Sequence, residues 1–337
     1  MANLQTEYMG IPVNNPLVAA ASSLSSHIDT IRRVADLGAG ALVIKSLFEE
    51  QIRHESGTLE TMLSLGDVSA ESTSFFPQLP PDGARNHLLW VERAREAIEM
   101  PLIASLNAVS TSGWVDYARK LAETGVDGLE LNVYAVEADL DRRSEEIEKR
   151  LIDNVAAVRA QTQLPLAVKI GPWFTSTANL VARLETAGAN AVVLFNRFFQ
   201  PDIDPERQEL FNRMTWSRAE DMRLPLRWIA LLYGRVGLDL FANTGVQEAA
   251  DIAKYILAGA KAVQVAGVLY RRKLTVIPEL LEGLQNWMDA KGYADLDAFR
   301  GKLSQAHHPA HPAVYERAQY FDFLRQANNE RVGADDE

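Results

Sequence analysis

The chain of 337 residues contains no cysteine. This absence excludes disulfides, thiolate zinc sites, cysteine-ligated iron–sulfur clusters and every cysteine nucleophile or base within the chain. The sequence also lacks a run of about 18 consecutive apolar residues, and its first residues show no basic flank before an apolar core. We therefore expect a cytoplasmic protein without a membrane partner.

Positive charge is scarce as well. Lysine and arginine total 34 against 45 aspartate and glutamate residues, and the formal net charge is -11. A surface of this sign repels polyanions. We expect a small-molecule substrate and no nucleic-acid partner.

The sequence does contain short runs rich in Val, Ile and Leu that alternate with amphipathic segments. This alternation is typical of an α/β protein in which helices cover a parallel sheet. Eight runs are candidate strands, at residues 16–21, 41–46, 101–107, 128–133, 165–170, 191–196, 238–243 and 262–266. An open doubly wound sheet gives the same local signals, but the count of eight favours a closed (β/α)8 TIM barrel.

Glycines mark four joints between a predicted helix and the next strand, at Gly38, Gly125, Gly188 and Gly259. A glycine can adopt the left-handed conformation that ends a helix, and the small residues after it let the chain enter the next strand at once. Four such joints indicate a repeated βα unit.

Two intervals between strands are long insertions, residues 47–100 after the second strand and 197–237 after the sixth. Such insertions commonly build lids over the site of a barrel, and Phe75-Phe76 and Phe198-Phe199 could form an apolar lid. The second interval contains a helix-like run at 216–236, and a further helix is predicted at 276–290. We predict a barrel over residues 1–303 and a tail over 304–337, partly helical and then disordered.

Four polar residues stand at the ends of apolar strands: Lys45, Asn132, Lys169 and Asn196. The C-terminal ends of barrel strands converge on one pocket, and lysines are rarely buried there without a partner. Each lysine could pair with a carboxylate such as Glu130, but the four residues together predict a site. Two ammonium groups there could hold an anionic substrate, form a Schiff base, or stabilise a cofactor that becomes negative when reduced.

Small residues follow the last two strands. Thr244 and Gly245 come after the seventh strand, and Ala266 and Gly267 come after the eighth. Barrels commonly bind a phosphate at these two positions through backbone N–H groups and a helix N-terminus. Each pair alone fits an ordinary tight turn, but together they indicate a phosphate tail.

In this order along the chain, the segments resemble those of soluble dihydroorotate dehydrogenases. The resemblance covers roughly residues 5–303 and rests on Asn15-Pro16 leading to Ala21-Ser22, on Lys45-Ser46, on the runs 129–133 and 167–169, on Thr244-Gly245 with 263–267, and on 291–303. It implies a homodimer that binds flavin mononucleotide (FMN) and oxidises dihydroorotate, a step of pyrimidine biosynthesis, by hydride transfer to flavin N5.

The same resemblance implies a role for each strand-end residue. The residues implied to surround the flavin ring are Ala21, Ser22, Lys45, Asn132 and Lys169, and those implied to hold its phosphate are Thr244, Gly245, Ala266 and Gly267. Lys45, Asn132 and Asn196 are implied to bind the substrate, with Lys45 also catalytic. Lys169 is suited to stabilise the anionic reduced flavin.

The loop after the fourth strand departs from the family pattern. Family members carry Asn-x-Ser-Cys-Pro-Asn, in which the cysteine, or a serine in the membrane-bound class, removes the substrate proton. This chain reads Asn132-Val133-Tyr134-Ala135-Val136-Glu137, so the base position holds Ala135, which cannot accept a proton. The family's Asn-Ser-Met-Gly-Leu substrate loop falls near residues 71–75, which contain no asparagine.

Three interpretations stay open. Tyr134, Ser72 or Ser74 replaces the base, the enzyme acts on a different small molecule, or the protein binds flavin without turnover. Because a phenol is ordinarily protonated at neutral pH, Tyr134 fits an acid in the reductive direction better than a base, or it packs at the pocket rim. A Schiff-base lyase that uses Lys169 or Lys45 is the rival among barrel enzymes.

The histidines of the tail do not predict a metal site. His307 and His311 have helical spacing, but Pro309 and Pro312 interrupt a helix there. The electron acceptor is open among quinone, fumarate, nicotinamide and oxygen, and an iron–sulfur relay would need a partner chain. Residues 197–237 offer a contact surface for the expected homodimer.

Overall fold

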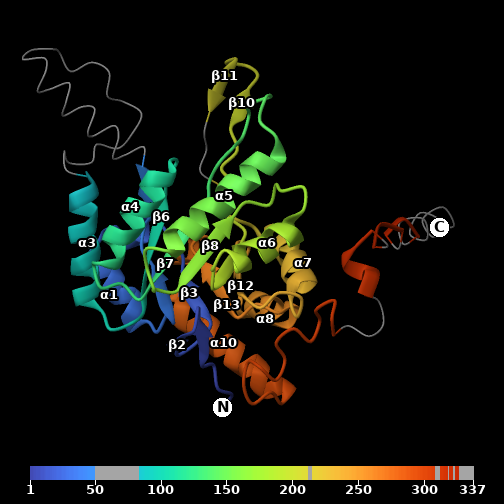
Figure 1. The fold of residues 1–337 in the computed structure, drawn as a ribbon. Coiled ribbons are helices and arrows are strands. Elements are labelled where there is room, and N and C mark those ends of the chain that lie inside the picture. The colour runs from blue at the N-terminus through green and yellow to red at the C-terminus, as the bar shows by residue number, and fades with distance from the viewer. Residues whose placement is uncertain (50–82, 212–214, 308–311, 318, 322, 326–337) are drawn as a thin grey trace, which may run out of the picture.

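Eight parallel strands close into a barrel with helices around its outside (Figure 1). The computed structural model describes residues 1–49, 83–211, 215–307, 312–317, 319–321 and 323–325. The barrel strands are β3 (Leu17–Ala19), β4 (Ala41–Val43), β6 (Leu102–Asn107), β7 (Gly128–Asn132), β8 (Leu166–Ile170), β9 (Ala191–Leu194), β12 (Asp239–Asn243) and β13 (Ala262–Val265). Pairing of β4 with β6 closes the ring. The prediction of a TIM barrel is confirmed.

Helices connect the strands along the outer surface: α1 (Ile28–Asp36), α3 (Gly83–Ala97), α4 (Thr111–Ala122), α5 (Ser144–Arg159), α6 (Thr177–Thr186), α7 (Arg223–Leu232), α8 (Ala249–Ala258), α9 (Gly267–Arg272) and α10 (Val276–Lys291). The four predicted helix-ending glycines, Gly38, Gly125, Gly188 and Gly259, all have positive φ. None of the helices in the described ranges is both long enough and apolar enough to cross a membrane.

Alternation along each strand decides which side chains enter the barrel. In β8, Leu166, Val168 and Ile170 pack in the layer between strands and helices, whereas Ala167 packs in the barrel interior. Lys169 shares the parity of Ala167, so its side chain also points inward. One strand thus supplies both an apolar outer face and a buried ammonium group.

A short hairpin that sequence reasoning missed closes the N-terminal end of the barrel. It consists of β1 (Thr6–Tyr8) and β2 (Ile11–Val13), which pair antiparallel. Tyr8 is fully buried, and its ring stacks on Phe241 with centroids 4.1 Å apart. Strands of three residues are too short for a periodic signal, so only the tertiary contact of Tyr8 identifies this plug.

The interval after β9 differs from its prediction. It contains an antiparallel hairpin, β10 (Asp202–Asp204) and β11 (Glu209–Phe211), which stands away from the barrel (Figure 1). The helix predicted at 216–236 is wrong at both ends, since a 3-10 turn, η2 (Ala219–Met222), leads into α7 at Arg223 and α7 ends at Leu232. Pro225 is tolerated in the first turn of α7, and Gly234, with φ +76, turns the chain after it.

Other predictions have separate outcomes. The helix expected at 276–290 is confirmed as α10. β5 (Leu47–Phe48) pairs beside β6 and begins the interval after β4. Ser72, Ser74, the segment 71–75 and Phe75-Phe76 lie outside the described residues, as do His308, His311 and the end of the tail. The domain boundary at residue 303 stays a prediction, with a 3-10 turn, η3 (Pro312–Tyr315), beyond it.

Candidate active site

A cavity of about 180 Å³ lies at the C-terminal ends of the barrel strands. Its lining brings together the following residues from the predicted site: Ala21, Lys169, Asn196, Thr244, Gly245, Ala266 and Gly267. These residues come from segments as far apart in sequence as β3 and β13, and they meet because parallel strands end at the same edge of the barrel. Three further residues of the predicted site lie at the same end of the barrel but do not line this cavity: Ser22, Lys45 and Asn132.

Lys169 is buried and has two partners inside the barrel. Its Nζ donates a hydrogen bond of 2.9 Å to Gln264 Oε1 and lies 3.7 Å from Glu130 Oε1. Gln264 in turn donates to Glu130 and to the hydroxyl of Tyr8. Glu130 is fully buried, and its Oε1 accepts no hydrogen bond within the described chain. The alternative of a lysine paired with Glu130 is therefore realised, at the wall of the cavity.

Burial raises the pKa of Tyr8 well above that of an ordinary tyrosine, and the nearby carboxylate of Glu130 adds to this effect. Tyr8 is therefore a neutral hydroxyl at the base of the Lys169 network. The network links the N-terminal plug to the cavity through a chain of buried hydrogen bonds.

We call the C-terminal end of the barrel, where this cavity lies, the mouth. The two asparagines at the mouth contact each other. Asn196 Nδ2 donates to Asn132 Oδ1, and Asn132 Nδ2 donates to Ser46 Oγ at 3.3 Å. Ser46 Oγ and Ser105 Oγ are 2.7 Å apart. The amide and hydroxyl groups thus form one row across β4, β6, β7 and the segment after β9, and their donors and acceptors suit a ring that carries amide groups.

Lys45 stands at the start of this row. Its backbone N–H donates to Ser25 Oγ at 2.7 Å, and Ser25 lies in the 3-10 turn η1 (Ser23–Ser26) that Ser22 begins. No ion pair of the Lys45 side chain occurs among the described residues. The half-buried ammonium group has a charge that suits an anionic ligand.

His87, on α3, is a neighbour of Lys45 that sequence reasoning missed. The residue is partly exposed, but its Nε2 is buried without a hydrogen-bond partner among the described residues. Burial, and then the charge of Lys45, lower the pKa of His87 to about 4. No motif marked this histidine, and only the packing of α3 against the mouth reveals it.

The loop after β12 belongs to the candidate anion site. Thr244 and Gly245 both have positive φ, +83 and +88, and the hydroxyl of Tyr255 donates to Thr244 O at 2.6 Å. Across the described part of the chain, the backbone N–H groups of Gly245 and Val246 make no hydrogen bond. Two unpartnered N–H groups beside a cavity are suited to phosphate oxygens.

The segment 217–222, which ends in η2, packs directly over the loops after β12 and β13. A Cβ added to Gly245 would lie 2.6 Å from Met222 Cβ, and one added to Gly267 would lie 3.2 Å from Ser217 Oγ. The carbonyl of Ser217 accepts from Gln247 Nε2 at 3.1 Å and from Arg271 Nη2 at 2.9 Å. Gly245 is thus needed for close packing of this cover, Gly267 lets Ser217 approach closely, and Arg271 adds a positive charge near it.

Tyr134 and Ala135 line a second cavity beside the mouth, of about 1,080 Å³. The Tyr134 ring is 38% exposed and stacks on Phe198 with centroids 4.0 Å apart. The stacking agrees with the alternative that Tyr134 packs at the rim.

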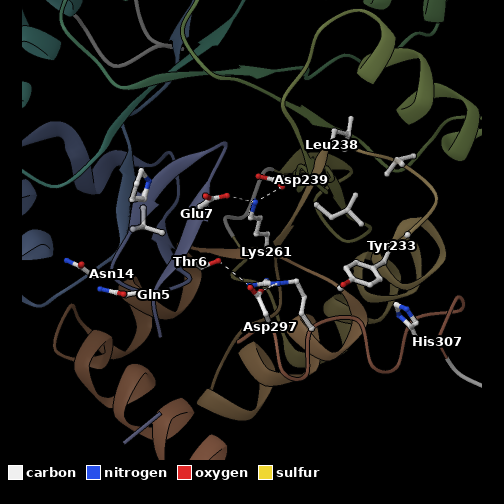
Figure 2. Close-up of a pocket in the computed structure, with 17 residues that line it drawn as sticks. Gln5, Thr6, Glu7, Asn14, Tyr233, Leu238, Asp239, Lys261, Asp297 and His307 are labelled. Atoms are coloured by element: carbon white, nitrogen blue, oxygen red, sulfur yellow. Dashed lines mark hydrogen bonds and ion pairs between the residues drawn. The ribbon is translucent and has the colours of Figure 1, made fainter. Parts of the chain in front are cut away.

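A third cavity, of about 870 Å³, lies at the opposite end of the barrel (Figure 2). Lys261 Nζ is 2.9 Å from Glu7 Oε2 and 3.0 Å from Asp239 Oδ1. Arg300 pairs with Asp297 at 2.9 Å. Although this cavity is larger than the one at the mouth, its charged groups hold the N-terminal hairpin and the C-terminal segment to the barrel.

The fold and the mouth define a (β/α)8 barrel protein whose polar site lies at the C-terminal strand ends. The family model for dihydroorotate dehydrogenase matches residues 3–288, so the chain belongs to the dihydroorotate dehydrogenase family. The resemblance drawn from the sequence is thereby confirmed.

Several curated archaeal relatives are named dihydroorotate dehydrogenase B (NAD(+)), catalytic subunit. The protein of Methanosarcina acetivorans is 27% identical over 297 residues, which cover 87% of this chain and 93% of the relative. That of Pyrococcus abyssi is 26% identical over 307 residues, 88% of this chain and 98% of the relative. The similarity extends over nearly the full length of each relative, so the barrel as a whole is shared.

Proposed function

We propose that this chain is an FMN-dependent oxidoreductase that acts on a carbon–carbon bond next to a carbonyl, with dihydroorotate as the first substrate to test. The observation that carries the proposal is one cavity lined both by the buried ammonium of Lys169 and by the loop whose Gly245 and Val246 N–H groups are unpartnered. This combination suits a ring that becomes anionic on reduction and carries a phosphate. Bound FMN supplies a ring that accepts and returns a hydride.

The residues at the mouth fit FMN in chemistry. Lys169 stabilises negative charge on the ring, with Ala21, Ser22, Lys45 and Asn132 as the proposed remaining ring contacts, and Thr244, Gly245, Ala266 and Gly267 as the proposed phosphate contacts. The volume of about 180 Å³ is below the roughly 300–1,000 Å³ of pockets that hold drug-sized ligands. Binding therefore requires lining side chains such as Phe199 and Trp216 to move.

The substrate is proposed to bind between Lys45 and the asparagine row. Lys45 pairs with a carboxylate, while Asn132 and Asn196 orient the carbonyl and amide groups of a small ring. The names of the relatives favour dihydroorotate and hence a step of pyrimidine biosynthesis. Because Ala135 cannot move a proton, Tyr134 is the proposed proton-transfer residue among those described.

Two rival functions differ in their support. A flavin-binding protein without turnover is favoured by one specific observation, Ala135 at the base position. A Schiff-base lyase requires a neutral, free amine. Since Lys169 Nζ donates to Gln264 and lies 3.7 Å from Glu130 Oε1, its nitrogen is already engaged and does not suit that role.

The test is a visible spectrum followed by an anaerobic titration. Purified protein should show the absorbance of bound FMN, and addition of dihydroorotate should bleach it. Bound FMN that dihydroorotate leaves oxidised would reject this substrate and support either another substrate or the protein without turnover. A chain that neither contains nor binds FMN would reject the proposal as a whole.

A matched pair of lysine variants tests the site assignment. Lys169→Ala should weaken FMN binding at least tenfold, because it removes the one ammonium group that lines the cavity. Lys261→Ala, which removes a paired lysine at the opposite end, should leave FMN affinity within about twofold. Equal FMN affinity in both variants would contradict the place proposed for Lys169.

We also propose a homodimer that forms through the hairpin β10–β11. Ile203 and Leu210 on this hairpin are 65% and 76% exposed, and Phe211 is 39% exposed. Exposed apolar side chains on a projecting hairpin are suited to a subunit contact. Light scattering should give the mass of two chains, and Leu210→Asp should give the mass of one.

The electron acceptor is proposed to be reached through a second chain. The relatives are named as catalytic subunits with NAD(+). Since this chain has no cysteine, any cysteine-ligated iron–sulfur relay must lie on that partner. Flavin reoxidation by NAD(+) should be slow in the isolated chain and accelerate with the partner present.

A further inference from the structure

The cavity of about 1,080 Å³ beside the mouth is lined by an unusual number of aromatic rings. We call it the aromatic vestibule and define it by Tyr134, Trp173, Phe174, Phe198 and Phe199. These rings come from the segments after β7, β8 and β9, and α5 forms part of the wall. The vestibule is therefore built from the loops that give barrel enzymes their substrate specificity.

The rings are packed in defined geometry and still face outward. Phe198 stacks on Tyr134 at 4.0 Å and meets Trp173 edge-on, with centroids 4.6 Å apart and planes at 79°. Trp173 is nevertheless 62% exposed and Phe199 is 54% exposed. A group of exposed rings around a concavity marks a binding surface for an apolar ligand, because scattered single exposed residues are the usual pattern.

The vestibule adjoins the proposed flavin site. Phe199 lines both the cavity at Lys169 and the vestibule. Ala135, at the family's base position, lines the vestibule as well. A ligand in the vestibule therefore lies beside the cavity at which the reacting bond is proposed to lie.

The charged groups of the vestibule are already paired. Arg150 and Arg142 both lie against Glu137, and Arg142 is also 3.5 Å from Asp139. Glu148 pairs with Arg183 at 2.9 Å. Within the described lining, each charged side chain thus has an opposite partner, and the vestibule offers its rings to an uncharged group.

We propose that the aromatic vestibule binds the planar, uncharged, apolar part of a substrate that is larger than dihydroorotate. The inference rests on the proposed function, since the reacting carbon–carbon bond then reaches Asn132 and Asn196 at the flavin. In the reductive direction the carbon β to the carbonyl gains a hydride from reduced FMN, and the α carbon gains a proton, so C=C becomes CH–CH. The hydroxyl of Tyr134, in the vestibule wall, is the proton donor.

A binding experiment compares two ligands that differ by one fused ring. Uracil and quinazoline-2,4-dione present the same amide edge, and only the second carries a fused benzene ring. Calorimetry on the FMN-loaded protein should give a Kd at least roughly tenfold lower for quinazoline-2,4-dione, in proportion to the added apolar area. The ligand should also quench tryptophan fluorescence, and Trp173→Phe should remove that quenching.

A turnover experiment uses a second matched pair. Coumarin and 5,6-dihydro-2H-pyran-2-one both carry a C=C bond next to a lactone carbonyl, and coumarin adds a fused benzene ring. With dithionite as the reductant, the enzyme should convert coumarin to 3,4-dihydrocoumarin with kcat/KM at least roughly tenfold above that for the monocyclic lactone. Tyr134→Phe should lower kcat while it leaves the Kd of quinazoline-2,4-dione within about twofold.

Aromatic variants assign the preference to the vestibule. Trp173→Ala should reduce the tenfold preference to less than about twofold. Phe321→Ala, which removes a phenylalanine that is 67% exposed on the C-terminal segment, should keep it. Circular dichroism and FMN content confirm that each variant is folded.

Each remaining outcome separates this inference from the proposed function. Bound FMN with no preference for the fused ring overturns the vestibule and leaves the flavin function intact. A preference for the fused ring in a chain that binds no FMN would overturn the flavin function and the reductive step, and would leave only the binding role of the vestibule. A dimer that Trp173→Ala dissociates would show that a second copy covers the vestibule, and that result overturns the inference.

Discussion

The two ends of this barrel carry similar side chains in opposite arrangements. At the N-terminal end, Lys261 lies between two carboxylates, and Arg300 binds Asp297 (Figure 2). At the C-terminal end, Lys45 has no ion pair among the described residues, and Lys169 faces a cavity with one carboxylate behind it. Charges that neutralise each other hold segments together, whereas charges left open to a cavity can act on a ligand.

The difference also explains why cavity size does not identify the site. The cavity at the N-terminal end is about 870 Å³ and that at the mouth about 180 Å³. Only the smaller one joins a buried ammonium group to unpartnered backbone N–H groups. The comparison predicts that substitutions at the mouth change ligand binding and, where they leave a buried charge unpaired, cause a large loss of unfolding free energy. Substitutions at the other end should change the unfolding free energy only slightly.

The largest effect is expected from Lys169→Met. Methionine has a similar volume, but it leaves the fully buried carboxylate of Glu130 without a counter-charge. Breaking a buried pair in this way costs about 3–5 kcal/mol. Urea denaturation of the FMN-free protein should show this loss in the free energy of unfolding.

A second substitution supplies the control for that experiment. Lys169→Met combined with Glu130→Gln removes both charges and keeps an acceptor for Gln264. The double variant should recover at least half of the lost free energy. A single variant within about 1 kcal/mol of the wild type would show that Glu130 and Lys169 do not form a coupled pair.

The sequence predicts the barrel well because its signals are local. Runs such as 165–170 and the glycines after the helices specify strands and joints within a few residues of each other. The strand-end positions of Lys169 and Asn196 follow from the same runs. The placement of site residues on strand ends is therefore the part of the site that sequence reasoning can reach.

Apart from Glu130, the partners of those residues are not predictable in the same way. Gln264 lies 95 positions from Lys169, and it reads as part of an ordinary apolar strand. His87 sits on a helix with no motif, and its proximity to Lys45 depends on how α3 packs. Tyr8 belongs to a strand of three residues. The contacts of Gln264 and Tyr8 are fixed by the alternation of side chains along the strands and by closure of the ring, and that of His87 by helix packing; no local window contains either.

A smaller effect at the mouth is expected from acidification. The pKa of His87 is about 4 in the folded chain, below its ordinary 6.5, because of burial and then the charge of Lys45. The unfolded chain therefore binds the proton more readily between these values, so the stability contributed by neutral His87 is present above about pH 6.5 and is lost as the pH falls toward 4. The loss amounts to about 3 kcal/mol, at 1.36 kcal/mol per pH unit.

Denaturation of the wild type and of variants between pH 4 and 7 measures this effect as the difference between their unfolding free energies. His87→Gln should flatten the dependence of unfolding free energy on pH over that range. Lys45→Met should flatten it in part, since Lys45 is the second cause of the lowered pKa. If the unfolding free energy of His87→Gln depended on pH in the same way as that of the wild type, His87 would not contribute to the pH dependence of stability.

The smallest effect is expected at the other end of the barrel. Burial alone would lower the pKa of Lys261, but its hydrogen bonds to Glu7 and Asp239 outweigh this and raise it above the ordinary value of 10.5. The stabilisation is therefore complete below about pH 10.5 and is lost as the pH rises through the folded pKa. Because the group is partly exposed, Lys261→Met should cost only about 1 kcal/mol at pH 7.

The comparison between ends is sharpest when Lys261→Met and Lys169→Met are measured together. The difference in unfolding free energy between wild type and Lys261→Met should shrink above about pH 10.5, where Lys261 loses its proton. Lys149→Met, which removes a lysine that is 70% exposed and paired with Asp153, should cost still less. A loss at Lys261 as large as that at Lys169 would mean that the N-terminal end holds a buried charge of its own, and the contrast between a ligand-binding end and a structural end would fail.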